Sequence, residues 1–379
     1  MFSTIILQLI VLFLPTQLGL HFWPDFARAA GIKVDYLSPT LYFVDLLIIL
    51  YIFPNLRKIF QWLRRYISSV LVLLVFILVN SFVGITPLNS FLWWTRNLLY
   101  LIFFLTLRLR KVTWSQIKTP LLVSTFLIVF LEIYQLLHQG SAGSLFYWLG
   151  ERTYSFSTPG LGRLSWFGLD LIRPQSTFSH PNSLAGYLLI VYYLLFVNKS
   201  VLWSKIMVFS GLVLALSKAA LLAFLLVFIF RINSGLLITV FLSLSLAQVF
   251  LPNLVASYQT IVDRIFLLAP AKKIIVSAPL FGVGLGNFIP ALSNLLPGSF
   301  LLPAKLQPVH NLFLLALSET GFLGIYLATR LFRKNLLKII QPRLLGLLAL
   351  IAITGAFDHY WWTLPQNKLI LLLAAAILL

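Results

Sequence analysis

Residues 119–138 read TPLLVSTFLIVFLEIYQLLH, an almost unbroken apolar run whose only charged side chain is Glu132. A helix rises about 1.5 Å per residue, so about 20 residues span the roughly 30 Å of a bilayer's hydrocarbon core. Lipid offers no hydrogen-bond partners, so the backbone of such a run must be paired within the chain. The run lacks the alternation of a barrel strand. It therefore predicts a transmembrane helix.

Runs of this kind recur along the whole chain of 379 residues. Hydrophobic residues make up 60% of it and charged residues 10%, with a mean hydropathy of +0.98. A soluble domain of this length would have too little polar surface to cover itself. We predict an all-α integral membrane protein, a single polytopic domain over residues 1–379 with about twelve transmembrane helices. The predicted spans lie near residues 2–20, 38–54, 66–84, 88–107, 119–138, 182–198, 201–217, 219–230, 234–251, 310–329, 343–357 and 363–379.

The charges between these runs are segregated. No Lys or Arg precedes the first run, which we therefore expect to be a span and not a cleaved signal peptide. With a cytoplasmic N-terminus, the inner connections hold many Lys and Arg and no carboxylate, as the cytoplasmic side of a membrane favours. We predict a multi-pass protein of the inner (plasma) membrane with this orientation. The inner basic residues are Arg57, Lys58, Arg64, Arg65, Arg108, Arg110, Lys111, Lys118, Lys199, Lys205, Arg231, Arg330, Arg333, Lys334, Lys338 and Arg343, and the outer carboxylates are Asp25, Asp35, Glu151, Asp170, Asp263 and Asp358.

Composition also excludes several classes of function. The formal net charge of +19 is mostly a topology signal with added attraction to anionic lipid, so nucleic-acid binding is not expected. The absence of cysteine excludes disulfides, thiolate metal sites and a cysteine nucleophile. The glycines of GVGLGNF, residues 282–288, follow no strand and do not make a nucleotide loop. They predict a backbone that a substrate or a helix can approach closely.

Two outer connections, residues 139–181 and 252–309, are long, and long connections tend to be functional. Both retain Arg and Lys on the outer side, which suggests an anionic ligand such as a phosphate or diphosphate. Contact with lipid headgroups is the alternative, since long loops translocate regardless of charge. Partly helical apolar spacing in the second connection suggests an interfacial amphipathic segment.

The first connection ends in RPQSTFSHPNSLAG, which begins at Arg173. Pro181 suits a first helical turn, which Ser179 or Asn182 is expected to cap. A capped helix start does not explain why Arg173 and His180 lie at the same membrane boundary.

A second motif, LALSKAALLAF at residues 214–224, places Lys218 between two apolar runs. The simpler interpretation of such a lysine is that it snorkels to the membrane surface.

The stretch PVHNLFLLALSETGFLG begins at Pro308 and enters a span. His310 and Asn311 lie at its outer mouth, and Glu319 lies within the membrane, where an ionisable group is a functional candidate. Nine residues along a helix are half a revolution round and about 13 Å deeper. Glu319 is therefore expected to pair within the bundle and not to orient His310. Arg96, another intramembrane charge, is expected to pair with a carboxylate.

Together and in order, four segments resemble the O-antigen ligase and O-antigen polymerase family of membrane glycosyltransferases. They are RPQSTFSHPNSLAGYL (173–188), LALSKAALLAF (214–224), DRIFLLAPAKKIIVSAPLFGVGLGNF (263–288) and PVHNLFLLALSETGFLG (308–324). The spans around them fit the family's twelve-helix, GT-C-like plan. The resemblance implies a role in cell-envelope polysaccharide biosynthesis, in which a glycan passes from an undecaprenyl-diphosphate-linked donor to a glycan, lipid or protein acceptor on the extracytoplasmic face. It also implies inversion at the sugar, with no metal and no cofactor.

The resemblance implies roles for single residues as well. His310 matches the family's essential histidine and is the expected catalytic residue. Arg264 and Arg173 match residues that bind the diphosphate, and Lys218 stands where family members commonly have Arg. Lysine keeps the charge but loses bidentate contact with phosphate. Supporting roles are expected for His180, Asn182, Asn311 and Glu319.

These residue types suit the reaction. Imidazole, whose ordinary pKa is about 6.5, accepts a proton from a sugar hydroxyl, and cationic side chains stabilise a departing diphosphate. Asp263 and Asp358 are candidates for orienting His310. Ligase and polymerase use the same residues and stay undistinguished. A polytopic membrane transporter is the alternative class; an outer cavity lined by His310 and Arg264 would favour the transferase, and a midplane cavity the transporter.

Overall fold

The computed structural model describes residues 2–29, 31–158, 160–166, 169–248, 265–296, 305–339 and 341–379, and there the chain is predominantly α-helical, as predicted. The helices are α1 Phe2–Phe13, α2 Phe43–Ile52, α3 Leu56–Arg65, α4 Ile67–Phe82, α5 Pro87–Leu109, α6 Trp114–His138, α7 Leu145–Trp148, α8 Pro181–Val197, α9 Leu202–Leu214, α10 Lys218–Phe224 with the π-helix Leu225–Ile229, α11 Ser234–Ala247, α13 Leu268–Ser277, α14 Phe288–Leu295, α15 Leu312–Ile339, α16 Pro342–Gly355, α17 Tyr360–Thr363 and α18 Pro365–Leu378.

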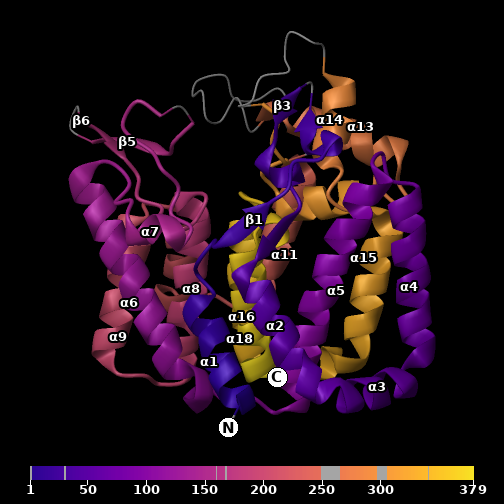
Figure 1. Cartoon of the computed structure of the whole chain (residues 1–379), viewed down its shortest axis with the longest axis horizontal. Helices are drawn as coiled ribbons and strands as arrows, with labels where there is room; N and C mark the ends of the chain where they lie inside the picture. The colour runs from indigo at the N-terminus through magenta and orange to yellow at the C-terminus, as the bar shows by residue number, and fades with distance from the viewer. Residues whose placement is uncertain are drawn as a thin grey trace.

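Short antiparallel strand pairs decorate this bundle. They are β1 Gly19–His21 with β4 Thr40–Tyr42, β2 Arg28–Ala29 with β3 Ile32–Lys33, and β5 Arg163–Trp166 with β6 Leu169–Ile172. The second and third pairs lie with α13 and α14 at one end of the bundle, which we call the loop end (Figure 1). The N- and C-termini and α3 lie at the opposite end, which we call the termini end (Figure 1).

Every predicted span overlaps one of these helices, but most of the helices are short. Among the described residues, three are long and apolar enough to cross a membrane on their own: Pro87–Leu109, Trp114–His138 and Leu312–Arg330. A fourth crossing is added if the bent pair Phe43–Arg65 and Ile67–Phe82 is taken as one span. The other apolar helices have 10–17 residues. The number of spans and their sidedness therefore stay predictions.

The segment expected to be the first inner loop is instead the helix α3, and α4 turns away from the preceding helical segment by 92°. Its basic side chains, such as Arg57 and Arg64, are exposed. A basic amphipathic helix of this kind favours a position along a membrane surface. At the nearby end of α5, Arg110 donates to Asn55 Oδ1 over 3.3 Å and Arg108 donates to the Ala376 carbonyl over 3.0 Å. These basic segments therefore share the termini end, in agreement with the charge pattern of the sequence.

Helix α8 forms the centre of the bundle and is buried along most of its length. It packs against α9 and α18. The first turn of α8 carries Asn182. Because the rest of the helix is packed in the core of the bundle, this turn is held in place.

Helix α15 is broken at Gly321, where φ is +64° and ψ is −176°. The segment before α14 fills the break, because Phe322 N–H donates to the Pro279 carbonyl over 2.8 Å and Leu323 N–H donates to the Leu280 carbonyl over 3.1 Å. A Cβ on Gly282 would lie 2.4 Å from the Glu319 carbonyl carbon, so only glycine allows this approach. The predicted close approach at the glycine-rich segment is thus made by a helix, which positions the segment that follows His310.

Candidate functional site

Two segments that are distant in sequence meet where α8 begins. Arg173 Nη2 donates to Asn182 Oδ1 over 2.9 Å, and Asn182 Nδ2 donates to Asp358 Oδ2 over 2.9 Å. The Asn182 amide therefore joins a guanidinium to a carboxylate through both of its ends. Asp358, which is only 7% exposed, precedes α17.

The path continues from Asp358 to the predicted catalytic histidine. Asp358 Oδ1 accepts from the backbone N–H of His359 over 2.8 Å. The His359 ring lies against the His310 ring, with centroids 5.3 Å apart and planes inclined by 61°. The His359 ring also contacts the ring of Tyr36, with centroids 5.6 Å apart. We call the set Arg173, Asn182, Asp358, His359 and His310 the histidine network.

Arg173 also reaches the motif that holds Lys218. Its Nε and Nη2 donate to the Ala215 carbonyl over 3.2 and 2.9 Å. Ala215 follows α9, and Lys218 opens α10 with its side chain exposed. The structure therefore brings the Lys218 segment beside Arg173, as the predicted diphosphate site requires. Arg264, the other predicted diphosphate ligand, and Asp263 lie outside the described residues.

The expected cap of α8 was wrong, because His180 takes that position and neither Ser179 nor Asn182 does. His180 Nδ1 accepts from the Asn182 N–H over 3.1 Å, and Ser183 Oγ donates to the His180 carbonyl over 2.7 Å. An imidazole nitrogen here does the work that a hydroxyl or amide oxygen usually does at a helix start. His180 thereby fixes the turn that carries Asn182.

Asn311 holds the His310 segment in place. Its Oδ1 accepts from the Phe313 and Leu314 N–H groups over 3.0 and 3.1 Å and so caps α15. Its Nδ2 donates to Gln248 Oε1, just beyond α11, over 3.0 Å. The side chain is fully buried, so its role is to position its neighbour His310.

Glu319 is occupied elsewhere, in agreement with the expectation that it pairs within the bundle. Its Oε2 accepts from Trp362 Nε1 over 2.7 Å and its Oε1 from the Phe288 N–H over 3.3 Å. A small pocket of about 10 Å³ lies next to it, with room for about one water. The pocket is lined by Tyr36, Trp93, Gly286, Phe288, Ile289, Pro308, Glu319, Trp362 and Thr363. This pocket is too small for a sugar ring, and His310 is not among its lining residues.

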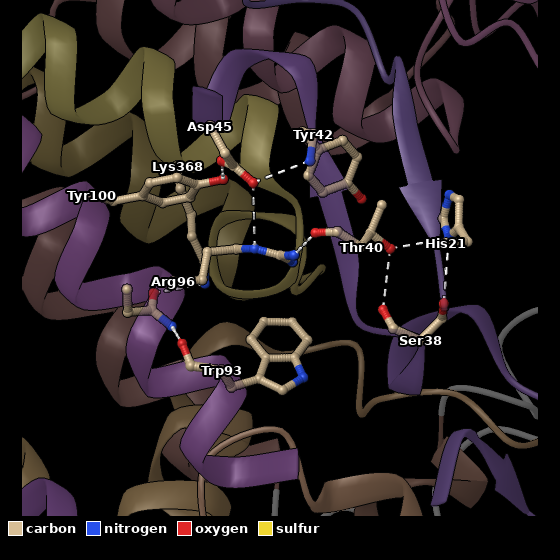
Figure 2. Close-up of polar contacts among 10 residues, drawn as sticks. His21, Ser38, Thr40, Tyr42, Asp45, Trp93, Arg96, Tyr100 and Lys368 are labelled. Carbon is tan, nitrogen blue, oxygen red and sulfur yellow. Dashed lines mark hydrogen bonds and ion pairs between the residues drawn. The ribbon is translucent and has the colours of Figure 1, made fainter. Parts of the chain in front are cut away.

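A second polar group, drawn in Figure 2, lies between α2, α5 and α18. Arg96 Nε is 3.9 Å from Asp45 Oδ2, which confirms the expected pairing of Arg96 with a carboxylate. Tyr100 donates to Asp45 Oδ1 over 2.9 Å, and the Arg96 guanidinium stacks 5.2 Å from the Tyr42 ring centroid. Lys368 Nζ donates to Asn97 Oδ1 over 2.9 Å. We call Arg96, Asp45, Tyr42, Tyr100 and Lys368 the arginine cluster.

Sequence reasoning gave no role to Tyr36 or to the His359 ring. The motif Asp358-His359 is visible at an outer boundary, and Asp358 is a predicted orienting partner. The structure places it two contacts from His310, through His359. Tyr36 lies in a connection more than 300 residues before His359, and nothing in the sequence around Tyr36 signals their contact.

Comparison with protein families gives a match to the model described as O-antigen ligase over residues 181–329. This match supports the resemblance to the O-antigen ligase family that the sequence motifs indicate. The matched segment includes Asn182, Lys218, Arg264 and His310, whereas Arg173 and Asp358 lie outside it. Comparison with curated proteins returned no match. The match supports a membrane enzyme of the O-antigen ligase type and does not favour the transporter alternative.

Proposed function

We propose that the protein transfers a glycan from an undecaprenyl-diphosphate-linked donor to an acceptor hydroxyl on the extracytoplasmic face of the membrane. The observation that carries the proposal is the histidine network. It joins three residues predicted for the site from two separate motifs: Arg173 and Asn182 from the first, and His310 from the second. Strands β5 and β6, which precede Arg173 in the sequence, and helix α14, which precedes His310, lie at the loop end, opposite the basic termini end (Figure 1).

In this proposal His310 is the general base. The acceptor hydroxyl attacks the anomeric carbon while its proton passes to His310, and the bond from that carbon to the diphosphate oxygen breaks. The electron pair leaves with the diphosphate, and attack from the opposite face inverts the anomeric centre. Negative charge grows on the departing oxygen, and fixed cations lower the energy of that state. We assign this role to Arg173, Arg264 and Lys218.

Arg173 is well suited to the role. Its guanidinium is held by Asn182 and the Ala215 carbonyl, so it is oriented before the donor binds. A positioned donor costs little reorganisation when charge develops. The same residues serve a ligase, which moves a finished glycan, and a polymerase, which joins lipid-linked repeat units. The acceptor alone separates the two.

The test is an assay of undecaprenyl diphosphate release from a lipid-linked glycan donor by the protein in nanodiscs. Acceptors are a lipid-linked repeat unit, a lipid core and a peptide, and EDTA is present throughout. We expect release with at least one acceptor, and a loss of at least about 10³-fold in His310→Ala, since general base catalysis supplies about 10²–10⁴-fold.

His138→Ala is the matched control, because His138 also contacts an aromatic ring, that of Tyr134 at 3.9 Å, but lies outside the network. Full activity of His310→Ala would rule out the base role. A requirement for metal would overturn the metal-free mechanism. Movement of a solute across sealed vesicles, with no release from any donor, would support a transporter.

A further inference from the structure

The second histidine of the network, His359, is buried and makes several contacts that hold its side chain and backbone. It is 4% exposed, and its ring contacts the rings of both Tyr36 and His310. Its backbone N–H is bound by the Asp358 carboxylate. A buried ring whose own orientation is held by several contacts can in turn hold the side chain that it contacts in a defined orientation.

Contacts with Thr363 are compatible with a His359 tautomer that carries its proton on Nδ1. Thr363 Oγ1 donates to the His359 carbonyl over 3.3 Å and also lies 2.9 Å from His359 Nδ1. A hydroxyl has a single hydrogen, so when that hydrogen goes to the carbonyl the oxygen accepts from Nδ1–H. The neutral ring then carries its proton on Nδ1, and Nε2 is the acceptor nitrogen. In that tautomer Nε2 is the ring atom that can stabilise a nearby positive charge.

We propose that His359 is a positioning residue that acts through His310. It orients the His310 imidazole towards the acceptor and stabilises the imidazolium formed when His310 takes the acceptor's proton. The inference rests on the proposed function and assigns part of its rate to a residue outside the matched family segment. No further proton or electron is required, since His359 keeps its own Nδ1 proton throughout.

Other ionisable groups around the pair remain fixed during this step. Burial raises the pKa of Tyr36 to about 12, so its hydroxyl stays protonated across the assay range. Asp358 is bound by Asn182 and the His359 N–H. Farther out, Asp35 and Arg152 form an exposed ion pair with a 2.9 Å contact, and Arg173 acts on Asp358 through Asn182. The histidine pair is therefore the part of the network expected to titrate with activity.

The decisive variant is His359→Asn, because the asparagine amide can still donate to Thr363 while no titratable ring remains. We expect kcat to fall about 10- to 100-fold with the donor KM changed less than about twofold, as for an interaction made only in the transition state. Protonation of His310 removes activity at low pH. A less stabilised imidazolium has a lower pKa, so the acid limb of the kcat profile should move to lower pH. His138→Asn is the matched control and should leave both unchanged.

A second pair of variants protects the test against misfolding. Thr363→Val removes the hydroxyl that contacts His359 Nδ1, whereas Thr363→Ser keeps it. We expect the acid limb to move in the valine variant and to return in the serine variant. If kcat and the limb match wild type in His359→Asn, or if both Thr363 variants share the wild-type limb, the proposal is overturned. Absence of release by the wild-type protein would instead refute the proposed function.

Discussion

The histidine network and the arginine cluster are both polar groups set among apolar helices, yet they are built differently. In the arginine cluster Arg96 is bound by a carboxylate, a tyrosine ring and the Thr40 carbonyl, all from the chain itself. In the histidine network the links are single hydrogen bonds and ring contacts that lead in series to His310. The first arrangement closes on itself, whereas the second ends at a residue that can act on another molecule.

The difference separates charge that holds helices together from charge that serves a reaction. A buried ion pair is costly to break, because removal of one partner leaves the other buried and uncompensated. The arginine cluster should therefore contribute to stability, and the histidine network to turnover. Substitutions in the arginine cluster should therefore be detected by unfolding measurements, and substitutions in the histidine network by measurements of kcat.

The sharpest test of this comparison after the histidine variants is Arg173→Met. Loss of an oriented cation at the diphosphate should lower kcat about 10²-fold, since one charge-stabilising donor contributes about 10²–10³-fold. Thermal stability in detergent should change little, because the Arg173 hydrogen bonds to the Asn182 amide and the Ala215 carbonyl have neutral partners. Activity per mole of folded protein is the measurement. A large fall in melting temperature at unchanged kcat would place Arg173 among the structural charges.

The opposite result is expected from Arg96→Met. Asp45 is 3% exposed and would lose its cation, so we expect a loss of about 1–3 kcal/mol, below the full effect of a buried pair because the Arg96 side chain is 19% exposed. Unfolding should be followed by tryptophan fluorescence. Asp45→Asn with Arg96→Met should recover part of the loss. If kcat per folded molecule falls as much as in Arg173→Met, the arginine cluster also serves turnover, and the proposed difference between the two groups is contradicted.

The smallest effect is expected from Lys218→Arg. Lys218 is exposed beside the carbonyl that Arg173 contacts, and arginine offers a bidentate fit to phosphate. The donor KM should fall by a few-fold with kcat nearly unchanged, whereas Lys218→Met should raise it. Equal KM values in all three proteins would show that this lysine only snorkels to the membrane surface.

Much of the fold could be predicted from the sequence, because a bilayer strongly restricts which backbone structures and charges it accepts. Long apolar runs identified helices, and paired charges such as Arg96 and Asp45 followed from the cost of isolated charge in the membrane. Helix α3 was missed, since a basic stretch between two spans resembles a loop unless its amphipathic period is weighed. The His180 cap was missed because capping preferences favour other residues. His359 and Tyr36 meet only through folding, and local sequence cannot report a contact between residues more than 300 positions apart.

The break in α15 has a consequence for how the sequence can vary. At Gly282 and Gly321 two backbones touch, and a Cβ on Gly321 would lie 2.3 Å from the Leu280 carbonyl oxygen. Alanine at either position cannot be accommodated by a small side-chain movement, because the added Cβ would clash with backbone atoms. The surrounding apolar residues can drift while these two stay, so a library of variants selected for folding alone should retain both glycines. Such a library would reveal which positions the close backbone contact constrains, independently of the chemistry at His310.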